Sequence, residues 1–195
     1  VDEPVLNLTK EGRNPTGLQT NFITGTLVAD PGDTVVYRLT LAHDPSSEAP
    51  VFALELTDLL PSFIRYDGAS VTPDAVITTG PNVQLVWSNS TLLGLVGGGP
   101  WSEASLSNIS ILVTGTVTNC VVSIPNQANV VYGCDPGCLS LNDSVSHTLS
   151  SEVNLQVTAA SSLQLTRCGG TRTLVITNLG GTATGLIVSN NAPSG

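Results

Sequence analysis

The chain has 195 residues, of which 41% are hydrophobic and only 11% are charged, and its formal net charge is −9. This acidic balance excludes nucleic-acid binding, which requires a basic surface, and it disfavours binding to anionic membranes. No apolar run approaches the about 18 residues that a membrane-spanning helix requires. Lys10 is the single lysine of the chain.

Short segments of alternating apolar and polar residues, separated by turn residues, follow one another along the chain. This alternation predicts β-strands, because successive side chains of a strand point to opposite faces of a sheet. No longer stretch repeats apolar residues with the helical period. We therefore predict an all-β protein with strands over residues 5–10, 33–42, 50–58, 82–88, 108–118 and 127–133, and one or two more within 144–159.

The C-terminal part of the chain repeats an earlier pattern. Residues 165–194 show the same order of features as residues 27–62: a turn, an alternating strand, a turn of small residues, a second alternating strand and a Pro-Ser ending. We predict one domain over residues 1–145 and a partial second repeat over residues 146–195. Because an incomplete sheet leaves an edge unpaired, either the natural chain continues past Gly195 or a neighbouring copy completes the unit by strand addition.

Four cysteines, Cys120, Cys134, Cys138 and Cys168, suggest an oxidising, extracellular compartment in a lysine-poor chain rich in Ser and Thr. All three disulfide pairings stay open, and Cys134–Cys138 is the most local. Cys134, Cys138 and His147 form an alternative zinc set. The second pair of closely spaced ligands that zinc sites usually contain is missing, so neither a metal nor a cofactor is predicted.

Four Asn-X-Ser/Thr sequons permit N-glycosylation in such a compartment. Their number does not exceed what the Asn, Ser and Thr content of the chain gives by chance. The four acceptors are Asn7, Asn89, Asn108 and Asn142.

Several motifs follow one another in a characteristic order. They are Leu8-Thr9-Lys10, PGDTVVYRLTL at 31–41, LTDLLPSFIRYDGAS at 56–70, Val86-Trp87, ISILVTGTV at 109–117 and NQANVVYG at 126–133. Over about residues 4–134 the chain resembles the DUF11, or conserved repeat domain, group of Ig-like modules, close to the fimbrial isopeptide-forming domains. The resemblance implies an Ig-like β-sandwich in a secreted stalk, sheath, surface-layer or fibre protein. It also implies a non-enzymatic role, with further repeats or neighbouring copies as partners.

Some members of this group form an intramolecular Lys–Asn amide with the help of a neighbouring carboxyl group. The matching positions are Lys10 and Asn126, which would be cross-linked, and Asp58, the assisting acid. Strand parity provides an independent test, because each of the three residues falls on the apolar face of its own strand. Burial would allow a neutral, nucleophilic lysine and a protonated carboxyl group.

A structural interpretation of the same three residues stays open. Lys10 could extend its ammonium to solvent at a strand end, Asp58 could cap the turn before Pro61, and Asn126 could lie in a turn after Pro125.

Other residue patterns give no catalytic site. His43 and His147 are expected to be solvated, and the segment 30–33 is expected to be a turn rather than a calcium site. Three alternatives to the surface-module function remain. The chain could be a filament subunit whose partial second domain is completed by a neighbour, an accessory module of a secreted hydrolase, or an adhesin.

Overall fold

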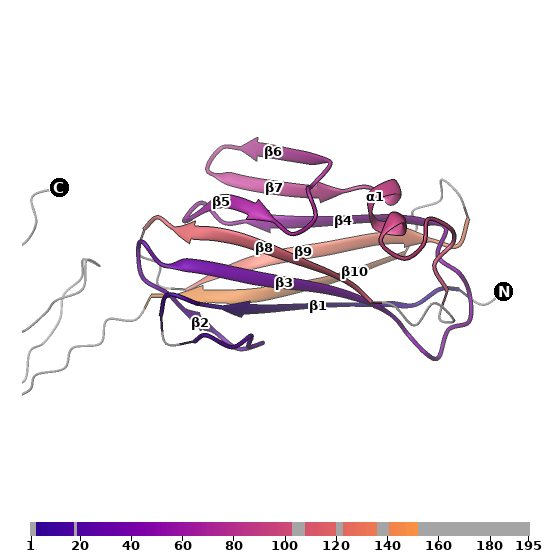
Figure 1. The fold of residues 1–195 in the computed structure, drawn as a ribbon, viewed down its shortest axis with the longest axis horizontal. Coiled ribbons are helices and arrows are strands. Elements are labelled where there is room, and N and C mark those ends of the chain that lie inside the picture. The colour runs from indigo at the N-terminus through magenta and orange to yellow at the C-terminus, as the bar shows by residue number, and fades with distance from the viewer. Residues whose placement is uncertain (1–2, 18, 103–107, 120–122, 136–140, 152–195) are drawn as a thin grey trace, which may run out of the picture.

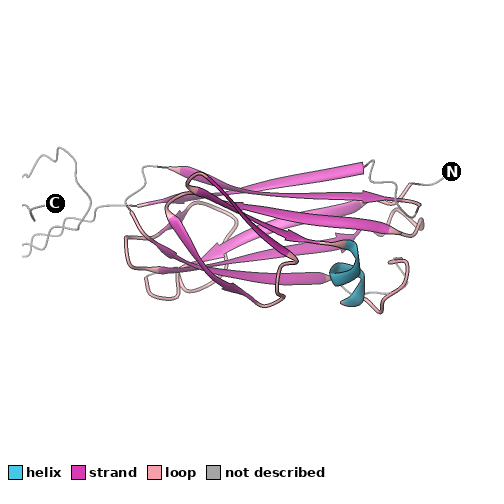
Figure 2. Cartoon of the chain, turned by 90° about the horizontal axis from the view of Figure 1, so that it is seen from above, coloured by secondary structure: helices cyan, strands magenta, loops and turns pink. Residues whose placement is uncertain are grey.

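A computed structural model of the chain describes residues 3–17, 19–102, 108–119, 123–135 and 141–151. The predicted all-β class is confirmed, because these residues form two stacked sheets and one short helix (Figures 1 and 2). The elements are β1 (Leu6–Arg13), β2 (Leu27–Val28), β3 (Thr34–His43), β4 (Ala53–Leu60), β5 (Ile64–Ala69), β6 (Ala75–Thr79), β7 (Asn82–Trp87), α1 (Asn89–Gly94), β8 (Ile109–Val117), β9 (Ile124–Gly133) and β10 (Leu141–Ser150).

The two sheets have four and six strands. The strand order is β1-β3-β8-β5 in the smaller sheet and β2-β10-β9-β4-β7-β6 in the larger one. Neighbouring strands are antiparallel except β2 and β10, which run parallel through Leu27–Leu149 and Val28–Ser150. This arrangement is consistent with an Ig-like β-sandwich, in which each sheet buries one face against the other.

The period-two pattern explains how the sandwich packs. In β8, buried residues alternate with more exposed ones from Ile109 to Val117, and in β1 the buried positions begin with Leu6 and Leu8. The inner faces of both sheets therefore supply a common apolar core. The largest fully buried side chains include Trp87, Trp101, Tyr37, Leu54 and Leu92.

Strand ends shift from their predicted positions, and three strands were not predicted. β2, β5 and β6 lack a clear period-two pattern: β2 has two residues, β5 contains an irregularity between Tyr66 and Gly68, and β6 has no alternating burial. Strand β10 also crosses residue 145, where a domain boundary was predicted. It pairs with β9 from Leu141 to Leu149, so the first sandwich extends at least through Ser150. The predicted second repeat lies largely outside the described residues.

Candidate functional site: a buried polar cluster

The three residues singled out from strand parity all lie inside the sandwich. Lys10 is 2% exposed, and Asp58 and Asn126 are completely buried. They lie within β1, β4 and β9, so their predicted inward direction is confirmed. The structural interpretation is wrong for each of them, since none extends to solvent or occupies a turn. Asp58 pairs with Ala128 in the β4–β9 register. Ala128 lies two residues after Asn126 on the same face of β9, so Asp58 and Asn126 are near neighbours on the inner face of the sheet.

Lys10 and Asp58 form a direct ion pair across the sandwich, from Nζ to Oδ1. Burial lowers the pKa of Lys10 and raises the pKa of Asp58, although the attraction between the two charges opposes both shifts. Both directions favour the neutral pair, because a charge removed from water loses most of its solvation. Transfer of a proton from the ammonium to the carboxylate is therefore less unfavourable here than it would be in water.

Asn126 is the unusual member of this cluster. Among the residues that the structure describes, neither Oδ1 nor Nδ2 of its carboxamide has a conventional hydrogen bond, and the second carboxyl oxygen of Asp58, Oδ2, also lacks one. Buried polar atoms are nearly always paired, and an unpaired one costs about 1–3 kcal/mol. Three such atoms in one interior region need a chemical explanation.

Tyr37 and His147 complete the cluster, and sequence reasoning did not assign them to it. Lys10 Nζ lies 5.1 Å from the centre of the Tyr37 ring, and the ring packs edge-on against His147 at 5.7 Å. Burial raises the pKa of Tyr37, while Asn126 partly offsets this effect from its position beside the hydroxyl. The Tyr37 oxygen makes no hydrogen bond of normal geometry. Tyr37 therefore lies close to both Lys10 and Asn126.

The expected solvation of His147 is wrong, because this residue is 1% exposed. Its position opposite Asn126 in the β9–β10 register places it on the inner face. Its Nε2–H donates to the carbonyl of Ile23 at 2.9 Å, which leaves Nδ1 as the unprotonated nitrogen in the neutral ring. Burial lowers the pKa of His147 and favours this neutral form. The signal available in the sequence was its parity with Leu149.

Gly12 allows β1 to approach this region closely. A Cβ atom at this position would lie 2.8 Å from Cε1 of His147 and 3.1 Å from a methyl carbon of Leu27. The backbone of Gly12 also pairs with Ile23 through two hydrogen bonds of 2.9 Å. A residue without a side chain is therefore needed where the His147 ring packs against β1.

The other predicted sites have simpler environments. Cys134 is exposed and forms no disulfide with a described residue, and Cys120, Cys138 and Cys168 lie outside the described residues. The four sequon asparagines, Asn7, Asn89, Asn108 and Asn142, are all exposed, so glycan attachment there stays a prediction. Within the described ranges no group of three or more His, Cys, Asp or Glu side chains could hold a metal ion, and no helix is long and apolar enough to cross a membrane.

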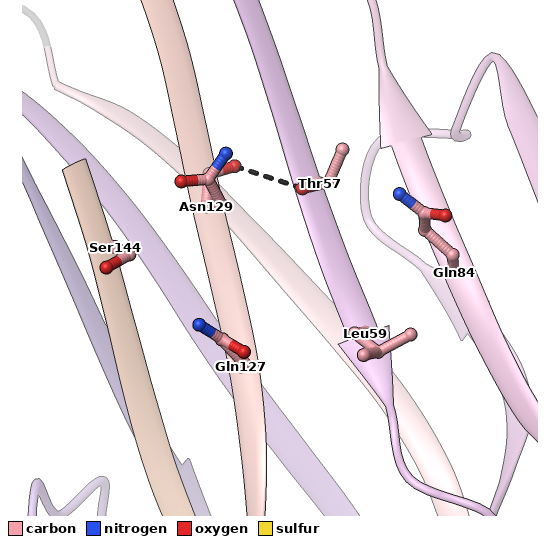
Figure 3. Close-up of a pocket in the computed structure, with 6 residues that line it drawn as sticks. All are labelled: Thr57, Leu59, Gln84, Gln127, Asn129 and Ser144. Carbon is pink, nitrogen blue, oxygen red and sulfur yellow. Dashed lines mark hydrogen bonds between the residues drawn. The ribbon is translucent and has the colours of Figure 1, made fainter. Parts of the chain in front are cut away.

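A shallow depression of about 340 Å³ lies on the outer face of the larger sheet, away from the buried cluster (Figure 3). Its lining contains carboxamides, hydroxyls and one leucine, and it contains no charged or aromatic side chain. The lining residues are Thr57, Leu59, Gln84, Gln127, Asn129 and Ser144.

No protein-family model matches the chain, and a comparison with curated proteins also gives no match. Similar solved structures include BcpA, the major pilin subunit of Bacillus cereus, at 12% identity and a TM-score of 0.46, with 76% of this chain and 41% of that chain covered. The C-terminal domain of the antigen I/II polypeptide BspA of Streptococcus agalactiae has 10% identity and a TM-score of 0.45, with 74% and 49% covered.

A C-terminal fragment of the major pilin of Streptococcus agalactiae has 9% identity and a TM-score of 0.43, with 74% of this chain and 56% of that chain covered. This chain therefore spans about half the length of each of these three structures. At such low similarity these proteins carry no evidence for its function. The DUF11 resemblance stays an expectation from the sequence motifs.

Proposed function

We propose that this chain is a non-catalytic structural module of a secreted cell-surface fibre, stalk, sheath or surface layer, reinforced by an internal amide bond between Lys10 and Asn126. The observation that carries the proposal is the buried Asn126 carboxamide, which makes no conventional hydrogen bond to any described residue and lies in the same interior region as a buried Lys–Asp pair. An Ig-like sandwich that links end to end suits such a role, and further repeats or neighbouring copies would be its partners.

The bond-forming step uses only the groups of this cluster. Lys10 gives one proton to Asp58, and the neutral Nζ attacks Cγ of Asn126. The protonated carboxyl group donates a hydrogen bond to Oδ1 while negative charge develops there. The Cγ–Nδ2 bond then breaks and Nδ2 leaves as ammonia, having taken a second proton from Nζ. The atoms balance: an amine and a carboxamide give a secondary amide and one ammonia, and Asp58 keeps the proton it received.

Formation of the Lys10–Asn126 amide would relieve the unfavourable burial of charged and unpaired polar groups in this cluster. Amide formation removes the buried ammonium charge, consumes the unpaired Nδ2, and leaves Oδ1 as an acceptor for the protonated Asp58. Before reaction, the Lys10 ammonium and the Asp58 carboxylate are both desolvated, and in a protein interior the attraction within an ion pair often does not offset this cost. Reaction therefore replaces two buried charges with neutral, hydrogen-bonded groups.

The location of the proposed bond suits a module that must resist mechanical force. Lys10 lies on β1, the edge strand of the smaller sheet, and Asn126 lies on β9 of the larger sheet. A covalent bond between them would hold the two layers together even if the hydrogen bonds of β1 were broken. Force applied through the N-terminal strand would then pass to the larger sheet through this bond.

Intact-mass measurement of the full chain, after complete reduction of disulfides, tests the proposal. We expect a mass lower than that of the sequence by one ammonia, and a branched peptide that contains both Lys10 and Asn126 after digestion. Lys10→Met should restore the full mass. Asn129→Ala, on β9 but directed outward, should keep the loss of ammonia. Full mass in the unmodified chain, with Lys10 and Asn126 in separate peptides, would contradict the cross-link.

The proposed location has a separate test. Antibodies against the chain should label intact source cells, and brief protease treatment of those cells should remove the label. Labelling only after the cells are permeabilised would contradict a surface role and would leave the cross-link result unaffected.

A further inference from the structure

Each sheet has two edges, and three of the four edges are protected against pairing with another chain. Along β1, the backbone N–H of Leu8 donates to the Asp143 carboxylate at 2.8 Å, and the N–H of Leu6 donates to the Tyr132 hydroxyl at 3.3 Å. Further along, Gly12 is hydrogen-bonded to the loop that precedes β2. The free side of β1 is therefore occupied by the protein itself.

The edges at β5 and β2 are protected differently. β5 is interrupted by an irregularity between Tyr66 and Gly68, and it carries an exposed ion pair between Arg65 and Asp67. Bulges and charges are common devices that prevent edge-to-edge association. β2 has only two residues, Leu27 and Val28, which is too short to act as a template for another strand.

Strand β6 has none of these protections. It is the last strand of the larger sheet and the outermost strand in Figure 1. Its sequence, AVITT, has no charge, proline or irregularity, and its four residues Val76 to Thr79 are exposed. Val76 and Ile77 keep 50% and 46% of their surface accessible. No backbone hydrogen bond from another described segment reaches its free side.

The hairpin geometry determines which backbone groups of β6 face outward. β6 joins β7 through the two-residue turn Gly80–Pro81, in which Gly80 has a positive φ of 59°. The residues that flank such a turn form a hydrogen-bonded pair, here Thr79 and Asn82, and pairing then alternates along the strands. The N–H and C=O groups of Val76 and Thr78 are therefore directed toward the free edge.

We propose that β6 pairs antiparallel with β6 of a second copy of this chain, about a two-fold axis at Ile77. In this register Val76 faces Thr78 of the partner copy, so the outward backbone groups of both strands form a hydrogen-bonded pair. The two Ile77 side chains meet on the outer face. Two larger sheets thereby become one continuous sheet, and the interface is self-complementary, as two-fold symmetry requires.

Charge favours a second copy at this edge. The chain carries a net charge of −9, so most contacts between two copies would bring like charges together. β6 has no charge, and the cross-strand row that continues from Ile77 through Gln84 to Leu59 is also uncharged. Asp74, which directly precedes β6, accepts hydrogen bonds within its own chain from Ser88 N–H at 2.6 Å and from the Thr91 hydroxyl at 2.8 Å.

Pairing of one short strand buries less surface than the about 1,200 Å² of a standard stable interface. A single pair of copies should therefore associate weakly, with a dissociation constant between about 1 μM and 1 mM. Tandem or arrayed modules would add such contacts through high local concentration. The inference is independent of the proposed Lys10–Asn126 bond.

Sedimentation velocity of the full chain over a concentration series provides the first test, with two matched variants. Ile77→Lys and Leu95→Lys each replace a side chain that is 46% exposed and each add one positive charge. We expect Ile77→Lys to raise the dimer dissociation constant at least about tenfold, and Leu95→Lys to leave it within about twofold. A wild-type chain that stays monomeric at about 1 mM, or equal effects of the two variants, would overturn the proposal.

Cysteine cross-linking tests the register. Facing residues of a non-hydrogen-bonded antiparallel pair lie about 4.5 Å apart between Cα atoms, which suits a disulfide. Under mild oxidation, Ile77→Cys should form a covalent dimer through its new thiol. Thr79→Cys alone should not, because position 79 faces position 75, and an equimolar mixture of Ala75→Cys and Thr79→Cys should.

Peptide mapping completes this experiment, with the wild-type chain as the baseline for its native cysteines. Equal cross-linking of the I77C and T79C variants would overturn the register. A disulfide from the I77C thiol to a native cysteine such as Cys168 would place the segment 152–195 on β6 and would overturn pairing of two β6 strands.

Discussion

The two ends of the sandwich interior are equally buried but chemically opposite. Near α1, the interior contains Trp87, Trp101 and Leu92, none more than 1% exposed. Near β2, the interior contains the Lys10–Asp58 pair and the carboxamide of Asn126. Burial of apolar surface stabilises the first end directly. The second end carries a desolvation cost, so its contribution to stability depends on the chemistry that its residues complete.

A substitution in the buried polar cluster should have the largest effect on the free energy of unfolding. Lys10→Met removes the proposed cross-link, which closes a loop of more than a hundred residues, and leaves Asp58 without its partner. We expect the free energy of unfolding to fall by about 5 kcal/mol or more, measured by urea denaturation of the full chain.

The double variant Lys10→Met/Asp58→Leu separates the two contributions. It removes the buried carboxyl group as well, so it should recover only the part of the loss that an unpaired Asp58 causes. Recovery of the full wild-type stability would show that no covalent bond contributes.

A substitution in the apolar region near α1 should have a smaller effect on stability and should not prevent formation of the proposed Lys10–Asn126 bond. Trp87→Leu leaves a cavity and removes the hydrogen bond from Nε1–H to the Val71 carbonyl, which is 2.9 Å long. We expect a loss of about 2–4 kcal/mol, with no change in the proposed loss of ammonia by intact mass. Leu95→Ala, at an exposed position, is the control and should change stability by less than about 0.5 kcal/mol. A restored ammonia mass in the Trp87 variant would contradict the independence of the two ends.

The smallest effect is expected at a surface carboxylate that contrasts with Asp58. Hydrogen bonds from the Ser46 hydroxyl, the Ser46 N–H and the Asn7 side chain lower the pKa of Asp44 from 3.8 to about 2. Because this pKa is lower in the folded state, the stabilisation is present above about pH 4 and is lost as pH falls toward 2. Asp44→Asn should therefore flatten the dependence of the melting temperature on pH within this window only. A difference in slope that persists above pH 5 would point to another group.

Several features of the polar end were predictable from local sequence. The alternation of apolar residues in the strands that hold Lys10, Asp58 and Asn126 fixed the parity of each residue, and a strand with one buried face has little freedom to reverse that parity. The same rule could have placed His147 inside through Leu149. The polar neighbours Ser146 and Thr148 make this segment less apolar than the strands that hold Lys10, Asp58 and Asn126, so its inward face is harder to recognise.

The boundaries of the fold were less predictable. Strand β10 continues past residue 145 because its pairing partner β9 is long enough to match it. The residue composition of β10 does not change near residue 145, so it does not indicate where the strand ends. The edge strands β2, β5 and β6 were missed for a related reason, since an edge strand buries little surface and so lacks the alternation that reveals a central strand.

The sequence by itself determined the all-β class, the low charge and the inward direction of the only lysine, because these follow from composition and from the two-residue period of a strand. Only the tertiary structure decided which buried groups meet. The approach of Lys10 to Asp58 across two sheets, the unpaired carboxamide of Asn126 and the open edge at β6 depend on strand order and register. These are set by packing between residues that are far apart in the chain, and a local pattern carries no information about such distances.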